Sequence, residues 1–247
     1  MAKSDKRARK RENKQIAREA RVEATKRAKR RRSTRSTAVI GVVLVIGVIA
    51  LSIIRSGNAE ACTKDEPKAS KRQTYETAPA MTIDPAKKYT ATIKTSCGDI
   101  VVALDPKAAP QAVNSFVFLA REQFFDGLTW HRVVTDFVIQ AGSPDGSGSD
   151  GPGYSFEDEL PTGDGYAPGS LAMANSGPNT NGSQFFIVTA KEKRDIANNG
   201  HTLFGKVTDG LDVAREIESF APESESRDGP PTRPIYIVSV RITESAP

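Results

Sequence analysis

The pattern of hydrophobic and polar positions changes near Lys88. From there to Leu104, apolar and polar residues alternate on both sides of the turn Ser96–Asp99. Side chains two positions apart lie on the same face of a strand, so one face of each stretch can be buried. The pattern predicts a β-hairpin at the start of a folded domain.

Two helical patterns and six more strand-like runs follow the hairpin. Pro110 begins a stretch in which Val113, Phe116 and Val117 recur at helical spacing, and Leu211–Ser219 has the same spacing. The strand-like runs are Thr129–Val134, Phe137–Ala141, Ser170–Ala174, Gln184–Thr189, Thr202–Val207 and Ile235–Ile242. With the hairpin they predict a mostly β domain over residues 88–247, a closed eight-stranded antiparallel barrel capped by two α-helices.

A different pattern occupies Ala38–Ile54, where 17 consecutive residues carry no charge. A helix of that length spans about 25 Å, just enough to cross a thin hydrocarbon core. A soluble helix that is apolar on every side would need a large core around it, and the flanks here are charged and polar. The sequence therefore predicts one transmembrane helix within residues 37–55.

Charge is distributed unevenly along the chain. Residues 1–36 contain 16 Lys and Arg against 4 acidic residues, whereas the whole chain has a net charge of only +5, so the remainder is acidic. By the positive-inside rule, residues 1–36 form a basic cytoplasmic arm and the folded domain lies outside the cell membrane of a single-pass protein. We expect contact between this arm and anionic lipids, and no specific nucleic-acid partner, because the arm has no aromatic residue to stack on a base.

The apolar run can be an uncleaved signal anchor or part of a cleaved export signal. The length of the basic region and of the apolar run favours the uncleaved anchor. Ala59-Glu60-Ala61 has the small-x-small form that a signal peptidase recognises, so cleavage after Ala61 remains open. A lipoprotein with Cys62 at its start fits less well. Residues 56–87 are poor in large apolar side chains and are predicted to be an extracytoplasmic linker, with a composition that favours a bacterial source.

The chain contains two cysteines, Cys62 and Cys97. Export to an oxidising compartment would permit one disulfide between them, joining the start of the linker to the first hairpin. Two free thiols remain the alternative, because the sequence does not show whether the two Cβ atoms come within bonding range.

Several kinds of site are disfavoured by the motifs present. Gly146-x-Gly148-x-x-Gly151 has the spelling of a dinucleotide fingerprint, but the residues after it cannot open a helix. The same loop lacks the Gly and the Glu that a calcium loop requires. The two His residues of the chain lie seventy positions apart, which fits no zinc site, and no Gly-x-Ser-x-Gly elbow of a hydrolase occurs.

Two dense segments combine polar and aromatic residues in a way that builds a concave site. Trp130–Gly142 supplies Arg132 and Gln140, and Gly169–Ile187 supplies Asn175 and further polar and aromatic residues. Any one of these residues alone would be read as a surface or core residue. Their joint occurrence on neighbouring strands indicates one shared wall.

These segments, together with Gly151–Tyr154 and His201–Gly205, resemble the cyclophilin family of prolyl isomerases from about Lys88 to Thr243. The resemblance implies a peptidyl-prolyl cis-trans isomerase, here in a membrane-anchored bacterial form, with Arg132 as the catalytic side chain. Around the substrate proline ring it places Phe137, Val138, Phe186 and Leu203. On the peptide backbone it places Gln140, Ala174, Asn175, Ser176, Gln184 and His201.

The chemistry of such a site needs no metal or other cofactor, because no covalent bond has to be made. We expect proline-containing polypeptides of exported proteins as substrates, and a monomer. Many cyclophilins carry a Trp a few residues before the His, whereas this chain has no aromatic residue in 195–200, so cyclosporin binding should be weak. A non-catalytic chaperone module that only binds proline-containing segments remains the alternative.

Overall fold

The computed structural model describes Cys62, Pro67 and residues 73–162, 165–194, 196 and 200–247. The predicted basic arm 1–36 and transmembrane segment 37–55 lie outside the described residues, as does most of the linker up to residue 72. Within the described part of the chain, no helix combines the length and the hydropathy that a membrane span requires.

The predicted hairpin is confirmed as strands β1 (Lys88–Thr95) and β2 (Gly98–Leu104). They pair antiparallel with Thr95 opposite Gly98. Tyr89, Ala91 and Ile93 are buried on one face of β1. The alternation of the sequence therefore sets which face of the sheet is turned to the core.

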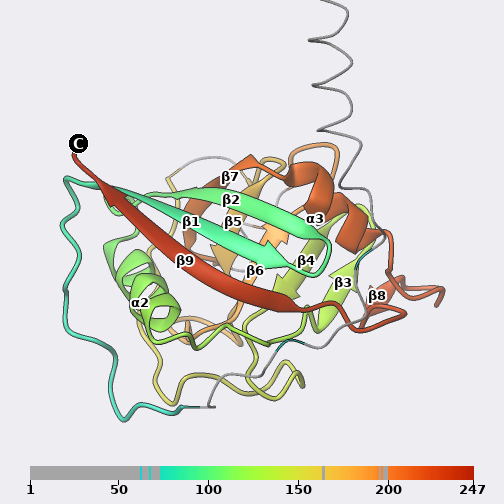
Figure 1. The fold of residues 1–247 in the computed structure, drawn as a ribbon, viewed down its shortest axis with the longest axis horizontal. Helices are drawn as coiled ribbons and strands as arrows, with labels where there is room; N and C mark the ends of the chain where they lie inside the picture. The colour runs from blue at the N-terminus through green and yellow to red at the C-terminus, as the bar shows by residue number, and fades with distance from the viewer. Residues whose placement is uncertain (1–61, 63–66, 68–72, 163–164, 195, 197–199) are drawn as a thin grey trace, which may run out of the picture. The chain divides into compact units, whose positions relative to one another are not determined.

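Nine strands form one continuous sheet in the order β8-β3-β4-β6-β5-β7-β2-β1-β9, and its curvature is visible in Figure 1. The remaining strands are β3 (Arg132–Val134), β4 (Val138–Ala141), β5 (Ser170–Met173), β6 (Phe185–Val188), β7 (Leu203–Asp209), β8 (Asp228–Gly229) and β9 (Ile237–Ser245). All the pairings are antiparallel.

The sheet is a half-barrel of nine strands and not the predicted closed barrel of eight. Its end strands β8 and β9 do not pair with each other in the described residues. The segment before β3 does approach the segment before β9. Thr129 and Tyr236 form an isolated β-bridge, and the Trp130 amide donates to the Ile235 carbonyl at 2.9 Å. The predicted strand at 129–134 is therefore a true strand only over its last three residues.

Two helices cover the half-barrel, as predicted. Helix α2 (Pro110–Arg121) begins with Pro at its first turn and buries Val113, Phe116 and Val117. Helix α3 (Leu211–Glu218) begins after Gly210, whose φ of 79° and close approach to the Asp99 carbonyl leave no room for a Cβ. In Figure 1, α2 lies beside β9, whereas α3 lies towards β3 and β4.

The apolar residues form two clusters, one on each side of the sheet. The larger lies inside the half-barrel, where the Phe116 ring contacts Phe125, Phe185 and Phe204 at centroid distances of 5.0, 5.5 and 5.4 Å. The smaller lies on the other side and includes Phe186. Because neighbouring side chains on a strand point to opposite faces, Phe185 enters the core and Phe186 lies on the outer face.

Part of the predicted linker packs on the domain. The amides of Thr82 and Ile83 donate to the Asn114 side-chain oxygen on α2, at 2.9 and 3.3 Å, and Ile83 is buried. A disulfide joins Cys62 to Cys97 in the turn between β1 and β2, the first of the two states that the sequence left open. The folded unit therefore begins before Lys88.

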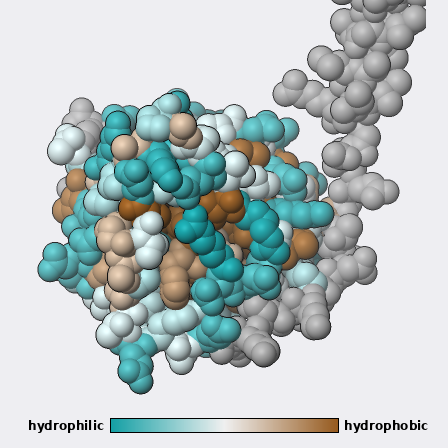
Figure 2. All heavy atoms as spheres, turned by 60° about the vertical axis from the view of Figure 1, so that its left-hand side comes forward, coloured by the Kyte–Doolittle hydropathy of each residue, from teal (hydrophilic) through white to brown (hydrophobic). Residues whose placement is uncertain are grey.

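The face of the domain shown in Figure 2 is mostly hydrophilic. Hydrophobic residues gather near the middle of this face, among hydrophilic ones, and smaller groups of them lie towards its sides. Of the large apolar side chains that the structure describes, Met81 and Leu160 are the two exposed ones. An extensive apolar docking face is therefore not part of the described surface.

Candidate active site

Strand register brings three of the predicted residues into one row. Arg132 on β3 lies opposite Gln140 on β4, and Gln140 lies opposite Phe186 on β6. Directly opposed residues share a face of the sheet and lie about 5 Å apart. Residues separated by up to 54 positions in the sequence thus form one continuous wall.

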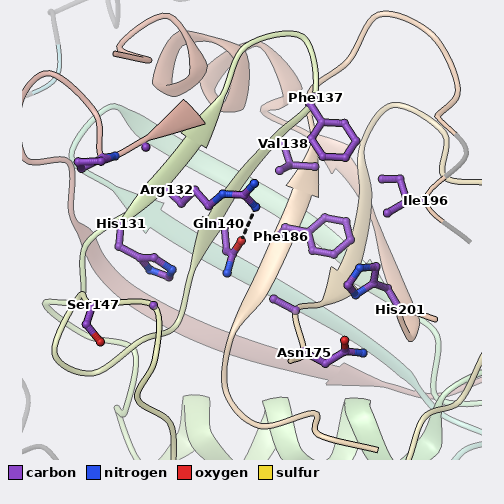
Figure 3. A pocket seen from close by; sticks show the side chains of 14 residues that line it. His131, Arg132, Phe137, Val138, Gln140, Ser147, Asn175, Phe186, Ile196 and His201 are labelled. Atoms are coloured by element: carbon purple, nitrogen blue, oxygen red, sulfur yellow. Dashed lines mark hydrogen bonds between the residues drawn. The ribbon is translucent and has the colours of Figure 1, made fainter. Parts of the chain in front are cut away.

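This wall borders a pocket of about 530 Å³. In Figure 3 the Arg132 guanidinium points from β3 into the space beside Gln140, while Phe137, Val138 and Phe186 form the apolar side. The pocket contains eight predicted residues: Arg132, Phe137, Val138, Gln140, Ala174, Asn175, Phe186 and His201. An apolar slot with a cation at its edge suits a flat, apolar ring attached to a polar backbone.

The other three predicted residues lie next to this pocket. Ser176 and Gln184 line an adjoining cavity of about 390 Å³, which shares Gln140, Gly148, Ala174 and Asn175 with the first. Leu203 packs against the smaller apolar cluster and is not among the residues that line the pocket. It lies opposite Ala172, which in turn lies opposite Phe186, so it extends the same apolar face of the sheet beside the pocket.

Six residues of the pocket were not predicted from the sequence: His131, Ser147, Gly148, Ile196, Gly229 and Pro230. Ile196 lies in the segment where the sequence shows no aromatic residue, and it supplies an aliphatic side chain to the wall. Gly229 and Pro230 come from the β8 segment, which has neither alternation nor helical spacing to mark it. His131 adjoins Arg132, and that adjacency was the one available signal.

The Arg132 guanidinium is held by three hydrogen bonds. Its Nε and Nη2 donate to the two carboxylate oxygens of Asp228, both at 2.7 Å, and its Nη1 donates to Gln140 Oε1 at 3.2 Å. A guanidinium has five N–H donors, so two remain for a ligand. The Arg132 and Asp228 side chains are 40% and 36% exposed, so the pair lies at the open edge of the pocket.

A chain of amide hydrogen bonds continues from Arg132 across the sheet. Gln140 Nε2 donates to Gln184 Oε1 at 3.0 Å, and Gln184 Nε2 donates to the carbonyls of Gly148 and Asp150, each at 3.0 Å. Gln184 therefore donates both of its side-chain N–H groups to the loop that contains Gly148 and Asp150. Gln140 donates one N–H group to Gln184 and keeps the other for a ligand. Gln184 orients Gln140 and has no N–H left for a peptide carbonyl.

On the opposite side of the pocket, His201 and Asn175 are held by backbone groups. His201 Nδ1 lies 3.1 Å from the Met173 carbonyl, and its ring stands edge-on to Phe186 at 5.2 Å. Because a carbonyl only accepts, Nδ1 carries the proton. Asn175 Nδ2 donates to the Gly200 carbonyl at 2.9 Å.

Burial lowers the pKa of both pocket histidines. For His201 the hydrogen bond to Met173 opposes this effect, and for His131 the positive charge of Arg132 adds to it. Neutral imidazoles are therefore favoured at neutral pH. In the described residues, no three His, Cys, Asp or Glu side chains gather as a metal would require.

Comparisons with known proteins show the family of the chain. The family model "Cyclophilin type peptidyl-prolyl cis-trans isomerase/CLD" matches residues 90–242. Peptidyl-prolyl cis-trans isomerase A of Mycobacterium tuberculosis is 39% identical over 180 residues, which cover 66% of this chain and 97% of the relative. Peptidyl-prolyl cis-trans isomerase B of Bacillus subtilis is 47% identical over 117 residues, covering 47% of this chain and 80% of the relative.

Solved structures show the same similarity. A cyclophilin-type peptidyl-prolyl cis-trans isomerase of Cryptosporidium parvum superposes with a TM-score of 0.57 at 31% identity, covering 65% of this chain and 99% of that one. The same Cryptosporidium protein has also been crystallised in the presence of the dipeptide Ala-Pro.

Proposed function

Since the chain belongs to the cyclophilin-type peptidyl-prolyl cis-trans isomerases, we propose that Arg132 is its catalytic side chain and that its substrates are exported proteins. The observation that carries the catalytic role is the guanidinium at the edge of an apolar slot, held by Asp228 and Gln140 with two donors left over.

Rotation about a peptide bond before proline breaks amide resonance, which sets a barrier of about 18–20 kcal/mol. As the C–N bond twists, the proline nitrogen regains its lone pair and can accept a hydrogen bond that the planar amide cannot. A donor fixed at that position binds the transition state more tightly than the substrate. Arg132 supplies this donor from its remaining N–H groups, and no bond to the protein is formed.

The rest of the pocket positions the substrate. Phe137, Val138, Phe186 and Ile196 form the apolar surface against which a proline ring packs. Gln140 and Asn175 present amide groups to the peptide on either side of the ring. Holding the ring and the backbone while one bond turns lowers the entropy cost of reaching the twisted geometry.

A peptide isomerisation assay on the full chain tests the catalytic role. One charge-assisted hydrogen bond contributes about 1.5–3 kcal/mol, so Arg132→Ala should lower kcat/KM by about 10- to 150-fold. Glu244→Ala is a suitable control, because Glu244 forms exposed ion pairs with Lys87 and Arg121 outside the pocket. Equal activity of wild type and Arg132→Ala would refute the proposed mechanism.

The proposed location rests on three observations: the apolar run Ala38–Ile54, the basic residues before it, and the Cys62–Cys97 disulfide, which oxidising compartments favour. We propose that the domain lies outside the cytoplasm on a single membrane anchor. Protease added to intact cells should then digest the domain, and protection until lysis would contradict the proposal. The intact mass of the membrane-extracted protein distinguishes an uncleaved anchor from cleavage after Ala61.

Two binding properties complete the proposal. We expect a monomer, since Met81 and Leu160 are the two large apolar side chains exposed in the described residues. We expect weak cyclosporin binding, because the wall of the pocket carries Ile196 where many cyclophilins have an aromatic residue. Sedimentation velocity and a cyclosporin titration followed by inhibition test these two expectations.

A further inference from the structure

The short strand β8 brings an acidic residue to the catalytic wall. Asp228 lies opposite Val134 in the pairing of β8 with β3, and Gly229 lies opposite Val133. The Thr135 amide donates to the Arg227 carbonyl at 3.2 Å, which fixes the segment just before Asp228. The connection from α3 to β9 thus returns to the sheet at the position where Arg132 emerges.

The contact between Asp228 and Arg132 is bidentate. Both carboxylate oxygens accept, at 2.7 Å each, from the Nε and Nη2 side of the guanidinium. This fork geometry fixes the plane and the direction of the group, which a single hydrogen bond does not do. The remaining hydrogens of Nη1 and Nη2 are consequently held in a defined orientation, with Gln140 taking one of those on Nη1.

Stability alone does not account for this pair. An ion pair whose two side chains are 40% and 36% exposed contributes little to folding, because water screens it. The arginine it holds is the proposed catalytic side chain, and the proposed reaction depends on the direction in which its guanidinium points. The hydrogen bond to Arg132 also lowers the pKa of Asp228, which keeps the carboxylate ionised at neutral pH.

We propose that Asp228 is a positioning residue of the isomerase: its carboxylate holds the Arg132 guanidinium in the orientation that meets the twisted prolyl nitrogen. The inference rests on the proposed catalytic role of Arg132. Asp228 anchors one end of the hydrogen-bonded chain and the Gly148 and Asp150 carbonyls anchor the other, with Arg132 and the two glutamines between them.

Removal of the carboxylate should affect the transition state more than the bound substrate. In Asp228→Ala, Arg132 keeps its charge and its contact with Gln140 but gains rotational freedom, so we expect kcat to fall by about tenfold. The Kd for an Ala-Pro peptide should change by less than about twofold, since ground-state contacts are retained. Asp228→Asn retains one acceptor oxygen and should lie between wild type and Asp228→Ala.

Exchange spectroscopy by NMR on the full chain with an Ala-Pro peptide gives kcat and Kd separately. The ¹⁵Nε–H resonance of Arg132 reports directly on the contact: it should broaden or move in Asp228→Ala and stay in place in Glu244→Ala. Glu244 is a matched control, because its side chain is 33% exposed and is paired with two cations, Lys87 just before β1 and Arg121 at the end of α2. None of these three residues lines the pocket.

A double substitution separates positioning from general damage to the domain. In an Arg132→Ala background there is no guanidinium to orient, so adding Asp228→Ala should leave the residual rate within about twofold. If Asp228→Ala lowers kcat equally in both backgrounds, or leaves kcat unchanged in the presence of Arg132, the positioning role is refuted. If Arg132→Ala itself retains full activity, the proposed catalytic role fails first.

Discussion

The Cys62–Cys97 disulfide leads to the most quantitative prediction for stability. The bond closes a loop with a sequence separation of 35 residues. Loop-closure entropy for that separation amounts to about 3.8 kcal/mol at 25 °C, within the usual range of about 2–4 kcal/mol for one disulfide. The double variant Cys62→Ala/Cys97→Ala should therefore have a free energy of unfolding lower by about 2–4 kcal/mol. Alanine is suitable because both cysteines are buried, at 2% and 5% exposure.

Urea unfolding followed by fluorescence measures this difference. Trp130 is the single tryptophan of the chain, is fully buried and stands edge-on to Phe185, so its emission reports on the domain core. A reductant should lower the stability of wild type to that of the double variant and should not affect the variant. For a domain of this size, about 3 kcal/mol corresponds to a Tm shift of about 6–12 °C.

Activity supplies the second readout of the same experiment. Neither cysteine lines the pocket, so kcat/KM under native conditions should be equal in wild type and double variant. A wild type that is insensitive to reductant, or two thiols that react with a thiol reagent in the native protein, would refute the reasoning.

Three further predictions concern the pocket and its support. Phe186→Leu keeps the site apolar but removes the aromatic face, so the Kd for an Ala-Pro peptide should rise by about 2- to 12-fold in an NMR titration. Lowering the pH through 6.5, the ordinary pKa of His, should reduce the free energy of unfolding. Burial lowers the pKa of His201 in the folded state, so the unfolded chain binds a proton there at a pH at which the folded chain does not. His201→Gln should weaken this pH dependence in urea titrations. Gly142→Ala should destabilise by at least about 2 kcal/mol, since a Cβ there would lie 2.3 Å from the Ser183 carbonyl at a φ of +96°; urea unfolding measures this loss.

The elements with regular periodicity could be predicted from the sequence. The β1–β2 hairpin and both helices occur where alternation or helical spacing is strongest, because each buries one apolar face. The short strands β3, β4 and β6 were found because aromatic and β-branched residues cluster in them, whereas β5 is a run of small and aliphatic residues. Their ends were less well predicted, since turn geometry and not hydrophobicity decides where pairing stops.

What the sequence could not show depends on distant contacts. Asp228 and Gly229 form a strand only because β3 offers them an unpaired edge. The half-barrel stays open between its end strands β8 and β9, which do not pair with each other in the described residues. The absence of Leu203 from the pocket lining, and the use of both Gln184 N–H groups by the loop, likewise follow from packing and register.

The central claim is that Arg132 stabilises the twisted X-Pro bond more than the planar one. The direct test measures, by NMR, the interconversion rate of the enzyme-bound Ala-Pro peptide and its Kd, for wild type and Arg132→Ala. The account predicts a bound-state rate lower by about 10- to 150-fold in the variant, with Kd changed by only a few-fold. An unchanged bound-state rate, or a loss that appears entirely in Kd, would contradict it.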